Sequence, residues 1–250
     1  MKRGATVILA CRDAVKGQAA CEAIVDATRN TKTTGKSCGG SVELMVLDLT
    51  DFASIDSFVK EFSSKYPRLD ILVNNAGVNT HGVTKYGLQQ LFAANYLGHY
   101  YLFRQLEPML TSTTGRGKNR TIPQCYASAA RVVNLSSVMH HIGGSKFNES
   151  AYYGTPSAKT SANLDCYSDS KLYMNYFTME INRRFFCSLT DKNCEHEVKK
   201  SSIAKYQSGS RSISAVSANP GAVRSDIWRA VPWPIRYFRK YQVPNVFVSK

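Results

Sequence analysis

One tyrosine–lysine pair in this chain has the spacing of an acid–base site. Tyr167 and Lys171 are four residues apart, so on a helix their side chains share one face, about 5–6 Å apart. A phenol with its ordinary pKa of about 10 transfers protons slowly at neutral pH, whereas a neighbouring ammonium favours the phenolate. The spacing therefore predicts a tyrosine with a lysine-lowered pKa, suited to moving a proton to or from a carbonyl oxygen. With 14 tyrosines in the chain, chance could also produce this pair.

Apolar runs alternate along the chain with stretches of helical periodicity. The runs are 5–10, 41–47, 70–75, 131–136 and 212–218, and the helical stretches are 13–29, 53–66, 84–110 and 167–186. Consecutive apolar positions are typical of strands that are buried on both faces. The alternation predicts a single α/β domain over residues 1–250, a doubly wound parallel sheet of the Rossmann type, with polar insertions at 111–129 and 188–211.

Small and polar residues follow every predicted strand. Ligands of open α/β sheets bind at the carboxyl ends of the strands, so these residues form the candidate site. In chain order they are Cys11, Arg12 and Asp13, then Asp48 and Leu49, then Asn74, Asn75, Ala76 and Gly77, then Ser136 and Ser137, and finally Asn219, Pro220 and Gly221. We expect them to gather on one edge of the sheet.

Several motifs support the tyrosine–lysine pair. They are DLTD at 48–51, NNAG at 74–77, Asn95 within LFAANYLGHYYLF, Ser137 within VVNLSS, YSDSK at 167–171 and NPGAVRSD at 219–226. In this order and approximate spacing, up to about residue 230, the chain resembles the short-chain dehydrogenase/reductase family, and within it the retinol-dehydrogenase-like branch. A joint chance match of all these motifs is negligible, although each is weak alone.

The resemblance implies an alcohol–carbonyl oxidoreductase that transfers a hydride between its substrate and a nicotinamide cofactor. Tyr167 is then the acid–base group, and Ser137 orients the substrate oxygen. Asn95 supports a proton-relay water, while Lys171 also holds the nicotinamide ribose. The branch implies a small-molecule substrate that is an apolar alcohol or carbonyl, such as a retinoid, a steroid or another lipid.

The predicted cofactor preference rests on Cys11 and Arg12. NAD-using members of the family carry an acidic residue where this chain has Cys11, and the guanidinium of Arg12 suits a 2′-phosphate, so NADP(H) is favoured over NAD(H). By resemblance, Asp48 contacts the adenine and Ser225 the carboxamide. The other implied cofactor-binding residues are Leu49, Asn75, Ala76, Gly77, Pro220, Gly221 and Val223, together with Tyr167 and Lys171.

The net charge of +14 is concentrated in three windows, 112–131, 183–211 and 224–250, which carry +4, +4 and +5. The last window interleaves aromatic residues such as Trp228 and Trp233 with arginines, a pattern typical of membrane-surface contact, although solvated loops or a substrate-covering helix would look similar. No nucleic-acid partner is expected, and the oligomeric state stays open.

Other features of the composition predict where the protein resides. The chain has no run of 18 apolar residues and no secretory leader, which predicts an intracellular protein, either cytoplasmic or peripherally membrane-associated. Its seven cysteines have no zinc-binding spacing, so we expect reduced thiols and no metal site.

The glycine-rich TGxxxGxG loop of the family is absent ahead of Gly4 and Ala5. We therefore expect an incomplete sheet, with a gap where the central strand would lie, and a further loss after about residue 230. Two interpretations stay open: part of an active NADP-dependent oxidoreductase, or a truncated, non-catalytic relative that acts as a binding or membrane-surface protein. The coding sequence upstream of Met1 would separate them, because an in-frame glycine-rich loop supports the first and a stop codon supports the second.

Overall fold

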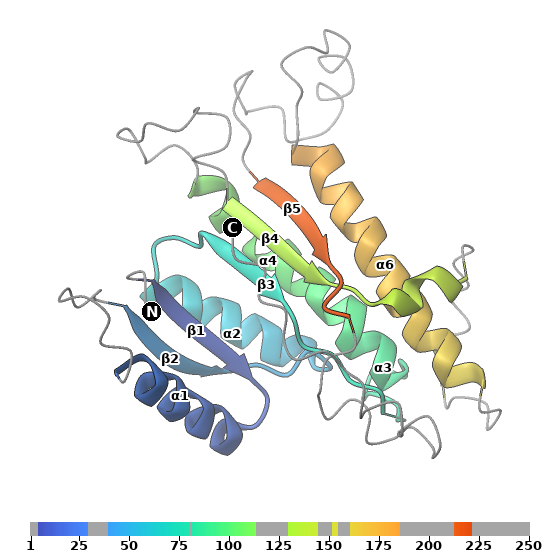
Figure 1. Cartoon of the computed structure of the whole chain (residues 1–250), viewed down its shortest axis with the longest axis horizontal. Coiled ribbons are helices and arrows are strands. Elements are labelled where there is room, and N and C mark those ends of the chain that lie inside the picture. Colours follow the sequence, from blue (N-terminus) through green and yellow to red (C-terminus); the bar gives the residue numbers. More distant parts are fainter. Residues whose placement is uncertain are drawn as a thin grey trace, which may run out of the picture.

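The computed structural model describes residues 5–29, 40–80, 82–113, 130–144, 152–154, 161–185 and 213–221, in which strands and helices alternate (Figure 1). The strands are β1 (Thr6–Cys11), β2 (Ser41–Val46), β3 (Ile71–Asn74), β4 (Ala130–Leu135) and β5 (Ile213–Ala218). The α-helices are α1 (Ala14–Arg29), α2 (Phe52–Lys65), α3 (Gln90–Phe92), α4 (Gly98–Ser112) and α6 (Ser161–Phe185). A π-helical turn, η1 (Ala93–Leu97), joins α3 to α4, and a 3-10 turn, η2 (Val138–Ile142), follows β4.

Every strand pair is parallel, and the described strands form two sheets. β1 pairs with β2, with Thr6 opposite Ser41, and β4 lies between β3 and β5, with Ile71 opposite Arg131. No strand of the described ranges joins β1 to β3, although Figure 1 shows them running side by side in the same direction. The predicted α/β fold with parallel strands is confirmed, and the break in the sheet falls between β1 and β3.

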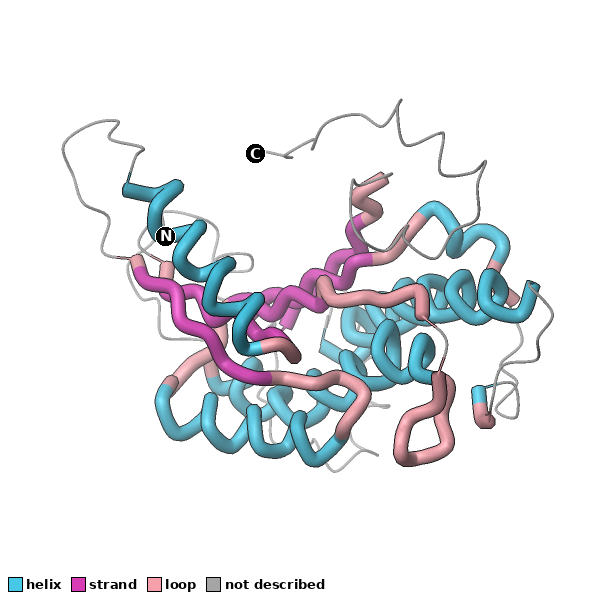
Figure 2. Tube along the Cα trace, turned by 90° about the horizontal axis from the view of Figure 1, so that it is seen from below, coloured by secondary structure: helices cyan, strands magenta, loops and turns pink. Residues whose placement is uncertain are grey.

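The helices pack on the strands through apolar faces. Helices α2, α4 and α6 lie on one side of the strands, and α1 covers β1 and β2 from the other side (Figure 2). In α2, Ile55, Phe58 and Phe62 recur at the three- and four-residue spacing of one helix face, and all three are buried. The helix begins after Asp51, whose carboxylate accepts a hydrogen bond from the backbone N–H of Ala53 at 3.0 Å.

A single main core lies between these three helices and the sheet. Its largest fully buried apolar side chains are Ile55, Leu106, Leu110, Val132, Met174, Ile181 and Ile213. They belong to α2, α4, β4, α6 and β5, so the segments that carry the candidate site are fixed to one another by close packing.

The other face of the three-stranded sheet is open to solvent in the part of the chain described here. Ile71, Val73 and Val216 are 54%, 54% and 56% exposed. The expectation that the strands are buried on both faces is therefore wrong for these residues, because α2, α4 and α6 all pack on the same side (Figure 2).

Some sequence predictions fall on residues that the structure does not describe. Residues 114–129, the insertion at 188–211 and residues 222–250, which include Val223, Ser225 and the aromatic–basic tail, lie outside the described residues. Within the described ranges, no helix is both long and apolar enough to cross a bilayer. The extent of the domain over residues 1–250 stays a prediction.

Candidate active site

The predicted catalytic side chains come from three segments that meet beyond the carboxyl end of β4. Ser137 follows β4, and its Oγ accepts a hydrogen bond from the backbone N–H of Met139 at 3.3 Å, which starts η2. Tyr167 and Lys171 lie one turn apart on α6, which packs against both β4 and η2. A side-chain hydrogen bond links Tyr167 to Ser137. Asn95 lies in η1, which also packs against α6.

Lys171 is buried at the centre of this group, with a side chain that is 5% exposed. Its Nζ donates a hydrogen bond to the carbonyl oxygen of Leu135 at 2.9 Å and lies 5.8 Å from the centroid of the Tyr167 ring. A Cβ placed on Gly77 would lie 3.6 Å from the same nitrogen, so the loop after β3 passes beside it. Burial disfavours the charged amine and lowers the pKa of Lys171 to about 8.

The environment of Tyr167 differs from the prediction. Burial raises the pKa of Tyr167, and the hydrogen bond with Ser137 acts in the opposite direction without reversing the shift. The prediction that Lys171 lowers the pKa of Tyr167 is therefore wrong. Desolvation of the phenol dominates, and the ammonium of Lys171 donates its hydrogen bond to the carbonyl of Leu135 instead.

Asn95 is fully buried and holds the loop after β3. Its Oδ1 accepts a hydrogen bond from the backbone N–H of Val78 at 2.7 Å, and its Nδ2 donates to the carbonyl of Val78 at 2.9 Å. Nδ2 also lies 3.4 Å from the Oγ of Ser170 on α6. The π-helical turn that carries Asn95 is of a kind frequently found at functional sites. Whatever else it does, this amide connects η1, the loop and α6.

The cofactor candidates on the two-stranded sheet follow β1 and β2. Arg12 is exposed directly after β1, beside Cys11, whose thiol has a pKa raised mainly by burial. Asp48 follows β2, and its Oδ1 accepts hydrogen bonds from the backbone N–H and the hydroxyl of Thr50 at 2.8 and 2.7 Å. Leu49 is partly buried next to it.

The remaining candidates extend from the three-stranded sheet. Asn75, Ala76 and Gly77 are exposed after β3, and Pro220 and Gly221 are exposed after β5. Gly221 has a φ of 68°, a left-handed conformation that favours glycine. The structure thus gathers Asn95, Ser137, Tyr167, Lys171 and Gly77 at one edge, while Arg12 and Asp48 lie across the break between β1 and β3.

Two neighbouring residues at the start of α4 matter to this geometry and did not stand out in the sequence. A Cβ on Gly98 would lie 2.2 Å from the carbonyl oxygen of Leu49, so only glycine allows this close approach. His99 is 3% exposed, and its Nε2 lies 2.8 Å from the carbonyl oxygen of Ala76. A lone glycine inside a helical pattern could have marked Gly98 as a site of close packing. A histidine in an apolar helix gives no comparable signal.

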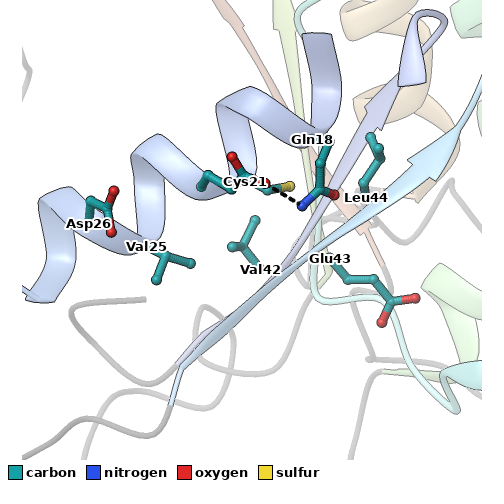
Figure 3. Close-up of a pocket in the computed structure, with 8 residues that line it drawn as sticks. Gln18, Cys21, Val25, Asp26, Val42, Glu43 and Leu44 are labelled. Carbon is teal, nitrogen blue, oxygen red and sulfur yellow. Dashed lines mark hydrogen bonds between the residues drawn. The ribbon is translucent and has the colours of Figure 1, made fainter. Parts of the chain in front are cut away.

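A cavity of about 660 Å³ lies elsewhere, between α1 and β2 (Figure 3). It is lined by Gln18, Cys21, Glu22, Val25, Asp26, Val42, Glu43 and Leu44. None of these belongs to the predicted site. Cys21 is one of three free thiols in the described ranges, with Cys11 and Cys166, and these ranges contain no group of three or more His, Cys, Asp or Glu side chains that could hold a metal.

Comparison with known proteins decides the family. The family model for short chain dehydrogenases matches residues 1–162, well over half of the chain. The chain belongs to the short-chain dehydrogenase family. Among its relatives, retinol dehydrogenase 12 from Bos taurus is 36% identical over 188 residues, which cover 73% of this chain and 50% of the relative. Retinol dehydrogenase 11 from Mus musculus is 31% identical over 233 residues, covering 91% and 57%.

Solved structures give the same fold, at a lower level of similarity. An uncharacterised protein from Mycobacterium Paratuberculosis has a TM-score of 0.57 and 27% identity, and the match covers 90% of this chain and 62% of that one. A short chain dehydrogenase from Salmonella enterica has a TM-score of 0.56 and 18% identity, over 95% and 78% of the two chains. This short-chain dehydrogenase chain spans about half the length of the curated relatives it matches, and its retinol-dehydrogenase-like character is confirmed.

Proposed function

We propose that this protein is an NADP(H)-dependent oxidoreductase that interconverts an alcohol and a carbonyl, with Tyr167 as the acid–base group. The observation that carries the proposal is the meeting of Ser137, Tyr167 and Lys171, in which Ser137 hydrogen-bonds the phenol and Lys171 is buried one turn away. Ser137 follows β4, whereas Tyr167 and Lys171 lie on α6, so two segments of a chain that belongs to a dehydrogenase family meet here.

The residues around the site fit a nicotinamide dinucleotide. Ala76 and Gly77 expose backbone with little side chain beside the ammonium of Lys171, so a flat ring and its ribose could approach closely there. Lys171 supplies donors for ribose hydroxyls, and the guanidinium of Arg12 supplies a fork of donors for a phosphate. When bound, such a cofactor supplies or accepts the hydride. Every other step of the proposal falls to the chain's own side chains.

Those side chains divide the work on the substrate oxygen. The hydroxyls of Ser137 and Tyr167 lie within hydrogen-bond reach of each other, so a substrate oxygen that replaces their mutual hydrogen bond can accept from both. In the reductive direction the phenol gives its proton to this oxygen, and in the oxidative direction the phenolate takes the proton back. Burial raises the pKa of Tyr167, so the phenol is protonated at neutral pH when no substrate is bound. The hydrogen bond with Ser137 favours the phenolate, and Lys171 Nζ lies 5.8 Å from the centroid of the Tyr167 ring.

The preference for NADP(H) over NAD(H) is supported by the end of β1. Arg12 is exposed there, and no carboxylate occupies the position of Cys11 to accept hydrogen bonds from ribose hydroxyls. Asp13, the next acidic residue, is engaged elsewhere, because its Oδ1 accepts from the backbone N–H of Lys16 at 3.0 Å at the start of α1. A free guanidinium next to an uncharged position suits a 2′-phosphate.

An apolar substrate is supported by the relatives. The retinol dehydrogenases 11, 12 and 13 that match this chain are named for retinol, and we extend the class to apolar alcohols and carbonyls such as retinoids, steroids and other lipids. Peripheral contact with a membrane would suit such substrates, but its candidate residues, the aromatic–basic tail, lie outside the described residues.

The test compares two tyrosines of α6. The protein, produced with any coding sequence that precedes Met1 in frame, is assayed for NADPH consumption with a retinoid aldehyde. Tyr167→Phe should lower kcat by at least about 100-fold, the size of a general acid–base contribution, while NADPH still raises the melting temperature. Tyr176→Phe, at an exposed tyrosine of the same helix, should leave kcat unchanged. Undiminished turnover in Tyr167→Phe refutes the assignment, and a parent protein that neither binds NADPH nor turns over favours the non-catalytic relative.

A further inference from the structure

Two side chains that follow β3 in the chain hold the loop 76–78 from both sides. Asn95 binds the backbone N–H and carbonyl of Val78 at 2.7 and 2.9 Å, and His99 Nε2 lies 2.8 Å from the carbonyl oxygen of Ala76. Gly77 lies between these two contacts. A Cβ on Gly77 would be 3.5 Å from Asn95 Oδ1 and 3.6 Å from Lys171 Nζ. The two contacts therefore set where the backbone of Gly77 passes the buried ammonium.

The chemistry of the His99 contact fixes one tautomer. A carbonyl oxygen only accepts hydrogen bonds, so Nε2 carries the proton and Nδ1 is left with a lone pair. Nδ1 is buried and has no hydrogen-bond partner within the described ranges. Burial, with a smaller contribution from the charge of Lys171, lowers the pKa of His99 to about 4, so the ring is neutral near pH 7.

An apolar side chain would pack here without leaving a buried acceptor unpaired. Burying an unpaired polar atom is destabilising, and phenylalanine has nearly the same shape as histidine. The neighbours of His99 on α4 are of that apolar kind, since Leu102, Phe103 and Leu106 are all buried. Packing therefore does not explain why this position carries an imidazole. The hydrogen bond from His99 Nε2 to the carbonyl of Ala76 is an interaction that phenylalanine could not make.

We infer that His99 is a positioning residue, which fixes the carbonyl of Ala76 through Nε2–H and so places the backbone of Gly77 beside Lys171 for the nicotinamide cofactor. The inference rests on the proposed function, because it assigns the loop 76–78 to cofactor binding. Because His99 is only 3% exposed, we expect it to touch neither cofactor nor substrate. Its effect should appear in how tightly NADPH binds and in how well the loop is held, and much less in the rate of the chemical step.

The experiment uses three substitutions and two measurements. His99→Phe removes the donor, His99→Gln keeps a neutral donor at the reach of Nε2, and His99→Asn carries the same amide on a side chain too short to reach Ala76. For each protein we would measure the dissociation constant for NADPH and the hydrogen-exchange rates of the Gly77 and Val78 amides. Losing one hydrogen bond should weaken NADPH binding and speed exchange by about tenfold in the Phe and Asn variants. The Gln variant should resemble the parent, and kcat at saturating NADPH should stay within about twofold in all three.

Each outcome bears on the inference. Equal exchange and equal NADPH binding in the Gln and Asn variants would overturn it, because both are neutral amides and only their reach differs. The same comparison serves if His99→Phe fails to fold. A fall in kcat with unchanged NADPH affinity would also overturn it, since that split belongs to a residue acting on the chemical step. If the parent chain does not bind NADPH, the proposed function fails on its own, and exchange at Val78 still decides whether His99 holds the loop.

Discussion

Replacing Lys171 with methionine should reveal how much the fold is destabilised by burying an ammonium. The pKa of Lys171 falls from 10.5 to about 8 in the folded chain, where the side chain is 5% exposed. Each pKa unit corresponds to about 1.4 kcal/mol, so the folded state is destabilised by roughly 3 kcal/mol when both states carry the proton. Methionine has a similar length and no charge, but it leaves the carbonyl of Leu135 without its donor, which costs about 1–3 kcal/mol. At pH 7 the two effects nearly offset, with a net gain of up to about 2 kcal/mol.

The pH dependence gives the sharper test, because the lost hydrogen bond is common to every pH. The folded-state pKa of Lys171 lies below the unfolded value, so the full penalty is present below about pH 8. Between pH 8 and 10.5 the folded lysine loses its proton before the unfolded one does. The unfolded state then binds more protons, and stability rises with pH by up to about 1.4 kcal/mol per unit. The advantage of Lys171→Met over the parent should therefore shrink by about 2–3 kcal/mol across this window.

Urea unfolding of the parent and of Lys171→Met, at half-unit steps from pH 7 to 10, measures this difference in free energy. Ionisation of tyrosines and cysteines affects both proteins alike, so it cancels in the difference. Lys16→Met is the matched control: Lys16 has an 84% exposed side chain, so its substitution should leave the pH dependence parallel to that of the parent. A constant free-energy difference between Lys171→Met and the parent across the whole range would refute the reasoning, because it would mean that the folded chain does not perturb this amine.

Two further substitutions test the cofactor preference and the packing beside the site. Arg12→Ala should lower kcat/KM for NADPH by about tenfold or more and leave kcat/KM for NADH nearly unchanged. The control Lys16→Ala, on the following helix, should alter neither value. Equal losses with both cofactors would remove the argument that Arg12 binds a 2′-phosphate. Gly98→Ala should lower the unfolding free energy by about 1–3 kcal/mol, because its Cβ would meet backbone at 2.2 Å. The loss should exceed that of Gly17→Ala, whose Cβ would meet side chains alone, those of Leu44 at 2.4 Å and Cys11 at 3.2 Å. Thermal melts of the two glycine variants measure this, and an equal or smaller loss for Gly98→Ala would contradict it.

The strands could be predicted from the sequence because a short, consecutive apolar run is typical of a buried strand. The run at 131–136 became β4 at Ala130–Leu135, and 212–218 became β5 at Ile213–Ala218. The helical stretch 84–110 was predicted as one element, yet the chain there first makes an antiparallel bridge between Val83 and Gln89 and is then divided by the π-helical turn η1. A π-turn adds one residue to a helical repeat, and apolar periodicity over so few residues does not register that change.

The site was predictable to the extent that it depends on residue type and spacing. The pair Tyr167 and Lys171 could be found because i, i+4 neighbours on a helix are close whatever surrounds them. The direction in which the pKa of Tyr167 shifts could not be predicted from the sequence. It depends on burial by other segments and on the hydrogen bond from Lys171 to the carbonyl of Leu135. His99 was missed for the same reason, since its partner, Ala76, is 23 residues away along the chain.

The two halves of the site have different structural supports. Ser137, Tyr167, Lys171 and Asn95 all belong to the body built on β3, β4 and β5, where α4 and α6 share one core with the sheet. Arg12 and the candidate Asp48 follow β1 and β2, across the break in strand pairing. The arrangement that we propose for proton transfer therefore depends on packing within one body, whereas the proposed cofactor selection depends on how that body sits beside a second sheet. Changes that loosen the junction of β1 and β3 should thus weaken NADPH binding before they disturb the hydrogen bond between Ser137 and Tyr167.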